Sequence, residues 1–373
     1  MAATIRDIAR AAGVSIASVS RAMNGMGNVA PETSARIHAV AAELGYVPSS
    51  AARSLVTRRT HLVGVILPDL YGEYFSELIR GIDRAARELG LHLLVSSAHG
   101  DGAEAASAIK AMSGRVDGLL LMSPHLDANS LQRSLPGGLP LVLMNTPLEG
   151  HGHASFTVDN HGGALAMMRH LAGRGFREVA FLSGPESNFD ARERLRGFRE
   201  AAAQFFPGSR MQILHGDFTE ESGWRTGSQI LALADRPDAI FAANDAMAIG
   251  CLFALSDAGV QVPRDIALVG FDDIPLARFV SPSLTTVRVR VAELGAFALE
   301  RLALSITHPE EVVGTPQVVR SELVVRASCT RRSAGVSAVD LRLEASGATV
   351  PAYLGSPARP VAVPGTPPRD GDG

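Results

Sequence analysis

The chain has few cysteines, few aromatic residues and almost no lysine. Its 373 residues include two cysteines, one tryptophan and four tyrosines, and Lys110 is the single lysine. Cys251 and Cys329 lie far apart without the spacing of metal ligands, so we expect packed thiols and neither a disulfide framework nor a metal site. No apolar run is long enough to span a membrane, and the first residues lack the apolar segment of a signal peptide. We therefore expect a soluble, cytoplasmic protein with no membrane partner.

Catalytic and nucleotide-binding motifs are also missing. The sequence contains no G-x-S-x-G, no P-loop and no H-E-x-x-H, the patterns that mark common hydrolases, NTPases and zinc proteases. His151 and His153 stand on a glycine-rich loop, where a solvated histidine is more common than a metal ligand. The run GMGNVA (25–30) imitates half of a dinucleotide-binding fingerprint, but it follows a helical pattern and not a strand. We expect no enzyme activity, no cofactor and no metal.

Charge divides the chain into a basic beginning and an acidic remainder. The net charge is −3. Residues 1–59 carry seven arginines against three acidic residues, a net charge of +4, which leaves −7 for the rest. A small basic segment on an acidic body is the charge distribution that contact with nucleic-acid phosphates requires.

Residues 4–24 read TIRDIARAAGVSIASVSRAMN and predict two short helices joined at Gly13. In the first helix the apolar residues recur at i, i+3, i+4 and i+7, and Thr4 is placed to cap it. Ser15 can cap the second helix, on which Val19 faces inward. An ordinary helical hairpin would have the same lengths. The spacing A-x3-G-V-S-x3-V-S-R favours a helix-turn-helix whose second helix enters the major groove. The residues expected to contact DNA are Thr4, Ser15, Ile16, Ala17, Ser18, Ser20, Arg21 and Asn24.

The same residues carry a family resemblance. TIRDIARAAGVS followed by SVSRAMNG resembles the opening of the LacI/GalR (lactose-repressor/galactose-repressor) family of bacterial transcription regulators, and the similarity extends to about Arg332. The resemblance implies a homodimer that binds double-stranded DNA at a palindromic operator. It also implies a small-molecule effector, which we expect to be a sugar or sugar acid that induces genes of carbohydrate uptake or catabolism.

A short alanine-rich segment follows the basic head. SSAARSLV (49–56) is too short to form a stable helix alone, so a flexible linker is one interpretation. The family resemblance implies a second one, in which residues 49–60 form a hinge helix on DNA and pair in the minor groove. Small residues such as Ala52 permit close helix approach, and Leu55 matches the position of a leucine wedge between base pairs.

From Leu62 onward short apolar runs alternate with helical patterns. Runs without polar alternation are typical of strands buried on both faces of a parallel sheet. They occur at 62–67, 91–97, 118–123 and 141–145, and again at 179–184, 211–216, 239–245 and 266–273. Two such series predict an α/β fold in which an all-α helix-turn-helix head precedes two doubly wound, periplasmic-binding-protein-like lobes with a cleft between them.

These patterns divide the chain into four parts. The head covers 1–48, the hinge 49–60, the two-lobed core 61–332 and a disordered tail 333–373. Lobe 1 takes about 61–160 plus 292–322, and lobe 2 about 161–291 plus 323–332. The tail lacks leucine heptads, so we expect a dimer and not a tetramer.

Ligands of doubly wound sheets bind beyond the carboxyl ends of the strands, where polar and aromatic residues gather in this sequence. The family resemblance assigns effector contacts there to Tyr74, Phe75, Asn145, Arg192, Phe218, Asn244 and Asp272. It gives Arg194 a structural role in anchoring the lobe. Asn145 replaces an aspartate often found at its position, and Met122 replaces a polar residue, so the effector's identity stays open.

Two other functions share part of this pattern. A sugar-binding transport protein would have the same two lobes, but it would need a signal peptide and would lack residues 1–59. A co-repressed regulator of another metabolic pathway would need every part that an induced repressor needs, so the sequence leaves the sign of the response open.

Overall fold

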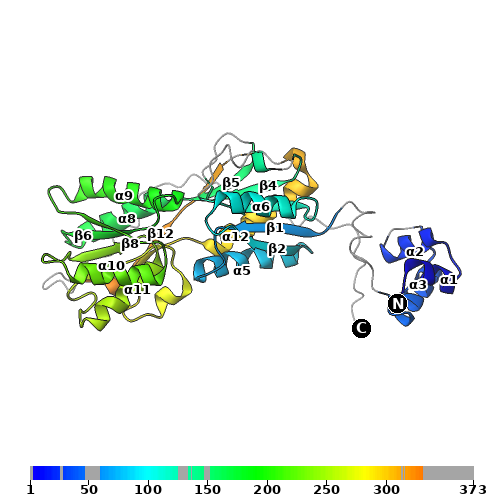
Figure 1. Cartoon of the computed structure of the whole chain (residues 1–373), viewed down its shortest axis with the longest axis horizontal. Helices are drawn as coiled ribbons and strands as arrows, with labels where there is room; N and C mark the ends of the chain where they lie inside the picture. The colour runs from blue at the N-terminus through cyan, green and yellow to red at the C-terminus, as the bar shows by residue number, and fades with distance from the viewer. Residues whose placement is uncertain are drawn as a thin grey trace, which may run out of the picture. The chain divides into compact units, whose positions relative to one another are not determined.

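The computed structural model describes residues 3–25, 28–46, 59–124, 133–135, 137–146, 152–311, 314 and 316–330. Most of the predicted hinge, with Ala52 and Leu55, and the predicted tail 333–373 lie outside the described residues. In the part of the chain that is described, no helix is both long and apolar enough to cross a membrane. The head and the two-lobed body are described separately below (Figure 1).

The head is a bundle of three short helices around its own apolar core. They are α1 (Ile5–Ala12), α2 (Ile16–Met23) and α3 (Pro31–Glu43). Each helix contributes one fully buried aliphatic side chain, namely Ile8, Val19 and Ile37. Thr4 and Asp7 form a reciprocal capping box at the start of α1, and Gly13 ends that helix at a φ of 65°, where a side chain would be strained. The predicted helix-turn-helix is confirmed.

Lobe 1 is built on a six-stranded parallel sheet in the order β11-β5-β4-β3-β1-β2. Its strands are β1 (Leu62–Leu67), β2 (His92–Ser97), β3 (Gly118–Met122), β4 (Leu141–Met144), β5 (Ala154–Val158) and β11 (Pro316–Val319). Its helices are α5 (Glu73–Glu88), α6 (Gly102–Met112) and α12 (Val291–Thr307). Helices α5 and α12 pack against each other along one face of the sheet (Figure 1).

Lobe 2 has a four-stranded parallel sheet in the order β7-β6-β8-β9. Its strands are β6 (Val179–Ser183), β7 (Gln212–His215), β8 (Ala239–Ala242) and β9 (Ala267–Val269). Two helix pairs cover its faces, α8 (Asn160–Gly173) with α9 (Phe189–Phe205) and α10 (Glu220–Leu231) with α11 (Asp245–Asp257) (Figure 1). Helices α10 and α11 pack backbone to backbone, so closely that a Cβ on Gly250 would lie 1.8 Å from the carbonyl oxygen of Glu220.

Two of the sequence-based predictions about strands were wrong. The runs at 91–97 and 211–216 were expected to be buried on both faces, but β2 and β7 are partly exposed. Both are edge strands with a neighbour on one side only. Strand β5 was not predicted, because Ser155 and Thr157 interrupt its apolar pattern.

The chain passes between the lobes near Asp159, near Val289 and between β11 and β12 (Glu322–Val324). Strand β12 pairs antiparallel with β10 (Thr286–Arg288) next to lobe 2. Short 3-10 turns at Pro275–Arg278 (η1), Pro309–Glu311 (η2) and Ala327–Cys329 (η3) complete the described part of the body.

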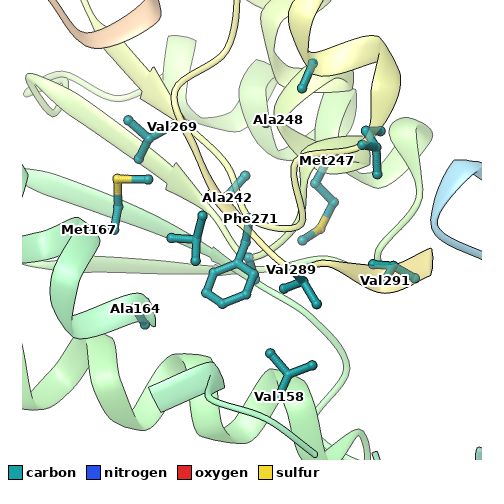
Figure 2. Packing of buried hydrophobic residues seen from close by; sticks show 14 of the residues in the cluster. Val158, Ala164, Met167, Ala242, Met247, Ala248, Val269, Phe271, Val289 and Val291 are labelled. Atoms are coloured by element: carbon teal, nitrogen blue, oxygen red, sulfur yellow. The ribbon is translucent and has the colours of Figure 1, made fainter. Parts of the chain in front are cut away.

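A continuous apolar core runs beneath these crossings. Figure 2 shows part of it, in which Phe271 from the end of β9 lies close to the crossing residue Val289, with Val158 from the end of β5 nearby. All three side chains are buried. Because this cluster draws on both lobes and on the crossings, the base of the interlobe cleft is firmly packed.

Candidate DNA-binding head and interlobe cleft

Helix α2 presents a mixed apolar and basic surface to solvent. Ile16, Ala17 and Arg21 are exposed, and Ile16 retains 48% of its accessible surface. Arg21 has no ion-pair or hydrogen-bond partner among the described residues. It is therefore available for a phosphate or a base edge.

The polar side chains of the head mostly serve its own helix ends. Ser15 Oγ accepts a hydrogen bond from the Ser18 backbone N–H (3.1 Å) and bonds to Ser18 Oγ (2.9 Å). Asn24 Nδ2 donates to the Ser20 carbonyl at 2.8 Å, and Thr4 Oγ1 donates to the Asp7 carboxylate at 2.6 Å. These bonds cap the start of α1 and both ends of α2.

A cavity of about 160 Å³ lies between the lobes at the carboxyl ends of the strands. Lobe 1 contributes residues that follow β1 and β3, namely Pro68, Asp69, Tyr71, Gly72, Glu73, Tyr74, Phe75, Met122 and Pro124. Lobe 2 and the segment after β9 contribute Asn188, Asp190, Arg194, Asp217, Phe218, Thr219, Glu220, Asn244, Ala246, Asp272 and Ile274. The lining combines aromatic walls with carboxylates, as a site for a small polyhydroxy ligand would.

Arg194 is the centre of the polar network at this cavity. It is buried, with 4% of its surface exposed. Its guanidinium donates from Nε to Asn160 Oδ1 (2.8 Å) and from Nη1 to the Ala243 carbonyl, and Nη2 lies 3.0 Å from Asp272 Oδ1. The same group lies 3.9 Å from the ring centroid of Phe271. All three guanidinium nitrogens are thus engaged by the protein.

Two buried carboxyl groups flank this arginine. Asp190 accepts hydrogen bonds from Asn145 Nδ2 (3.2 Å) and Asn160 Nδ2 (2.7 Å). Burial raises the pKa of Asp190 and of Asp272 to about 6 each, although the positive charge of Arg194 opposes both shifts. Asp272 Oδ1 accepts no hydrogen bond of good geometry, despite its ion pair with Arg194. This oxygen is fully buried beside the guanidinium.

Backbone strain gathers at the same place. Three non-glycine residues of the network or the lining, Asn145, Phe218 and Asp272, have φ values of 43°, 73° and 115°. Such conformations are costly for residues with a side chain and cluster at ligand sites. The neighbouring Asp273 holds the crossing strands in place, since it pairs with Arg278, Arg288 and Arg326.

Comparison with known proteins agrees with both parts of the structure. Residues 4–49 match the model of bacterial regulatory proteins of the lacI family, and residues 168–329 match a periplasmic binding protein-like domain. The chain is 37% identical to the ribose operon repressor of Escherichia coli (strain K12) over 316 residues, which cover 82% of this chain and 94% of that protein. It is 36% identical to the PurR transcriptional repressor of Edwardsiella ictaluri over 334 residues, 87% of this chain and 96% of that one.

The chain belongs to the LacI family. Among solved structures, the Lac repressor dimer bound to operator and an anti-inducer superimposes with a TM-score of 0.80 at 28% identity, covering 88% of this chain and 99% of that one. These findings confirm the family, the fold class and a DNA-binding transcriptional regulator. The relatives are repressors and not enzymes.

Five of the seven effector residues expected from the sequence line the cavity of this LacI-family chain, namely Tyr74, Phe75, Phe218, Asn244 and Asp272. Asn145 is fully buried behind them, where its Nδ2 also lies 3.3 Å from the Tyr74 hydroxyl.

Arg192 does not line this cavity. It is exposed, and its Nη1 donates to the carbonyls of Glu186 (3.0 Å) and Ser187 (2.8 Å) outside the cavity. On α9 a shift of two residues turns a side chain about 200° around the helix axis, so Arg194 faces the cavity instead. Arg194, for which an anchoring role was expected, therefore lies at the cavity.

Sequence reasoning also missed Asp190 and Asn160. Both are short polar residues within or at the start of a helix, where a cap or a solvated side chain is the ordinary expectation. One signal was available. Asp190 lies four residues before Arg194, so the two share one face of α9.

Proposed function

We propose that this chain is a dimeric repressor whose operator binding is relieved by a small, uncharged polyhydroxy compound bound in the interlobe cleft. The observation that carries the proposal is the lining of the cavity, in which the buried Arg194–Asp272 pair stands among aromatic and carboxylate side chains. Its relatives in the LacI family include both the ribose operon repressor and PurR, so the family by itself does not choose the effector.

The charge of the lining argues against an acidic effector. Six carboxyl groups line the cavity, those of Asp69, Glu73, Asp190, Asp217, Glu220 and Asp272. The single cation in the lining, Arg194, is already paired with the Asp272 carboxylate. A ligand carboxylate or phosphate would therefore meet negative charge with no free counter-charge. Hydroxyl groups donate to carboxylates, so this geometry favours neutral sugars over the sugar acids that the sequence left open.

The aromatic side chains of the lining favour a sugar ring as the ligand. Tyr74 and Phe75 meet edge to face at 5.3 Å on one wall, and Phe218 lies on the other. Aromatic faces cover the apolar faces of a sugar ring and leave its hydroxyls to the polar groups.

Direct bonds between the lobes provide an element that an effector can bias. Asn145 of lobe 1 donates to Asp190 of lobe 2, and at the rim the Leu276 N–H donates to the Glu73 carboxylate at 2.9 Å. A ligand hydroxyl that binds Asp190 competes with the Asn145 contact. Ligand binding would then change the relative stability of conformations in which the two lobes keep or lose this contact.

Lobe 2 also exposes three large apolar side chains that a second copy of the chain would cover in a dimer. Trp224, Phe253 and Phe279 are exposed by 49%, 60% and 80%, although each is large and apolar. Trp224 and Phe253 lie on the closely packed pair α10/α11 and so hold fixed positions. A dimer formed through these side chains would carry two heads, one for each half of a palindrome.

The test compares matched neutral and acidic sugars. Thermal shift of the full chain is measured with ribose, galactose and glucose and with ribose 5-phosphate, galacturonate and gluconate. Operator release is then followed by fluorescence anisotropy. The proposal expects stabilisation and release by at least one neutral sugar and by none of the acids. Stabilisation by acids only would contradict the uncharged class, and tighter operator binding with sugar would make it a co-repressor.

A further inference from the structure

The recognition helix carries an exposed isoleucine that local packing does not explain. Ile16 is the first residue of α2, is 48% exposed and belongs to none of the apolar clusters of the head. Contact with water does not stabilise an isoleucine side chain at this position. Covering it with another apolar surface would lower the free energy.

The neighbouring polar groups are already bonded within the head. The hydroxyls of Ser15 and Ser18 bond to each other and to the helix N-terminus. Ala17 presents only one methyl group. Arg21 stands one turn after Ala17 on the same side of the helix and supplies the charge. Ile16 is therefore the large apolar side chain that the start of α2 presents to solvent.

The major groove offers one kind of apolar group, the C5-methyl of thymine. We propose that Ile16 reads a thymine methyl in each half-site of the operator, so that this chain recognises one thymine by apolar contact and not by a hydrogen bond. The inference rests on the proposed operator binding, but it goes further, since it names the base and the atom that is recognised.

The decisive change is the removal of that methyl from the DNA. An operator is first selected in vitro from random DNA with the full-length protein. Each thymine is then replaced in turn by deoxyuridine, which keeps every hydrogen-bonding edge and lacks only the methyl. For the wild type we expect one position per half-site at which affinity falls about fourfold, or about fifteenfold when both half-sites are changed. This is the factor expected for about one buried methyl per half-site.

The variant that links this effect to the residue is Ile16→Ala. It should bind the thymine operator more weakly than wild type, and at the same position it should no longer distinguish thymine from deoxyuridine. Leu44→Ala is the matched control, because Leu44 is also an exposed aliphatic residue of the head, 41% accessible, but stands at the end of α3. That variant should keep the full discrimination. Far-UV circular dichroism checks that both variants are folded.

The remaining outcomes contradict either the thymine contact or operator binding. Wild-type affinity that responds to no deoxyuridine replacement overturns the proposal, and so does discrimination that persists undiminished in Ile16→Ala. Failure to select any sequence at all would contradict operator binding itself. The two failures are therefore distinguishable.

Discussion

Two arginines that are two residues apart provide the sharpest test of the cleft. Arg194 is 4% exposed and pairs with the buried Asp272, whereas Arg192 is exposed and donates to backbone carbonyls of the loop before α9. Removing one partner of a buried ion pair leaves the other charge uncompensated and costs about 3–5 kcal/mol. Arg194→Met should lower the free energy of unfolding by that amount, and Arg192→Ala by less than about 1 kcal/mol.

The measurement is urea unfolding at a fixed protein concentration. The single tryptophan of the chain, Trp224 on α10, reports on lobe 2, and circular dichroism reports on the whole chain. Asp272→Asn and the double variant with Arg194→Met complete a double-mutant cycle. We expect the double variant to be at least about 1 kcal/mol more stable than the sum of the single effects, because no unpaired charge remains.

The same variants separate folding from effector binding. Arg192→Ala should release operator on addition of sugar like the wild type. Arg194→Met, studied at a temperature where it is folded, should not respond. Loss of the response in Arg192→Ala together with a normal response in Arg194→Met would refute the placement of the site. Additive effects in the cycle would refute the coupling between Arg194 and Asp272.

Three further predictions concern packing, pH and DNA. Gly250→Ala should destabilise lobe 2 by about 1–3 kcal/mol in thermal unfolding, because its Cβ would collide with a carbonyl oxygen of α10; Gly173→Ala, with open space around it in α8, should be neutral or slightly stabilising. Effector affinity, measured by calorimetry, should be constant above about pH 7 and should fall below about pH 6, where Asp190 and Asp272 take up protons and lose acceptor capacity; a flat profile down to pH 5 would contradict this. The raised pKa values have the opposite effect on the unliganded fold, because the folded state then binds more protons than the unfolded one, so both groups favour folding more at pH 5 than at pH 7. Arg21→Ala should weaken operator binding more than binding to random DNA and should flatten the salt dependence of affinity; equal losses on both DNAs would remove Arg21 from the base-reading set.

Several features of the chain followed from local sequence. The caps Thr4 and Ser15, the turn at Gly13 and the 3.6-residue stripe of α1 are set by neighbours within one or two turns, so the head could be predicted nearly residue by residue. The alternation of apolar runs and helices gave the two parallel sheets, because a strand buried on both faces shows this in its own composition.

Other features depend on which segments meet in space. The edge position of β2 is set by sheet order, and its exposure follows from the strand that it lacks as a neighbour. The choice between Arg192 and Arg194 depends on the rotation of α9 against the sheet, and both residues are arginines in a helical sequence. The pairing of Asp190 with Asn145 joins residues of different lobes, 45 positions apart. Local sequence therefore determined the elements and the place where a ligand should bind, at the strand ends. Only tertiary packing decided which charged side chains are buried there and with which partners they pair, because those neighbours are distant along the chain.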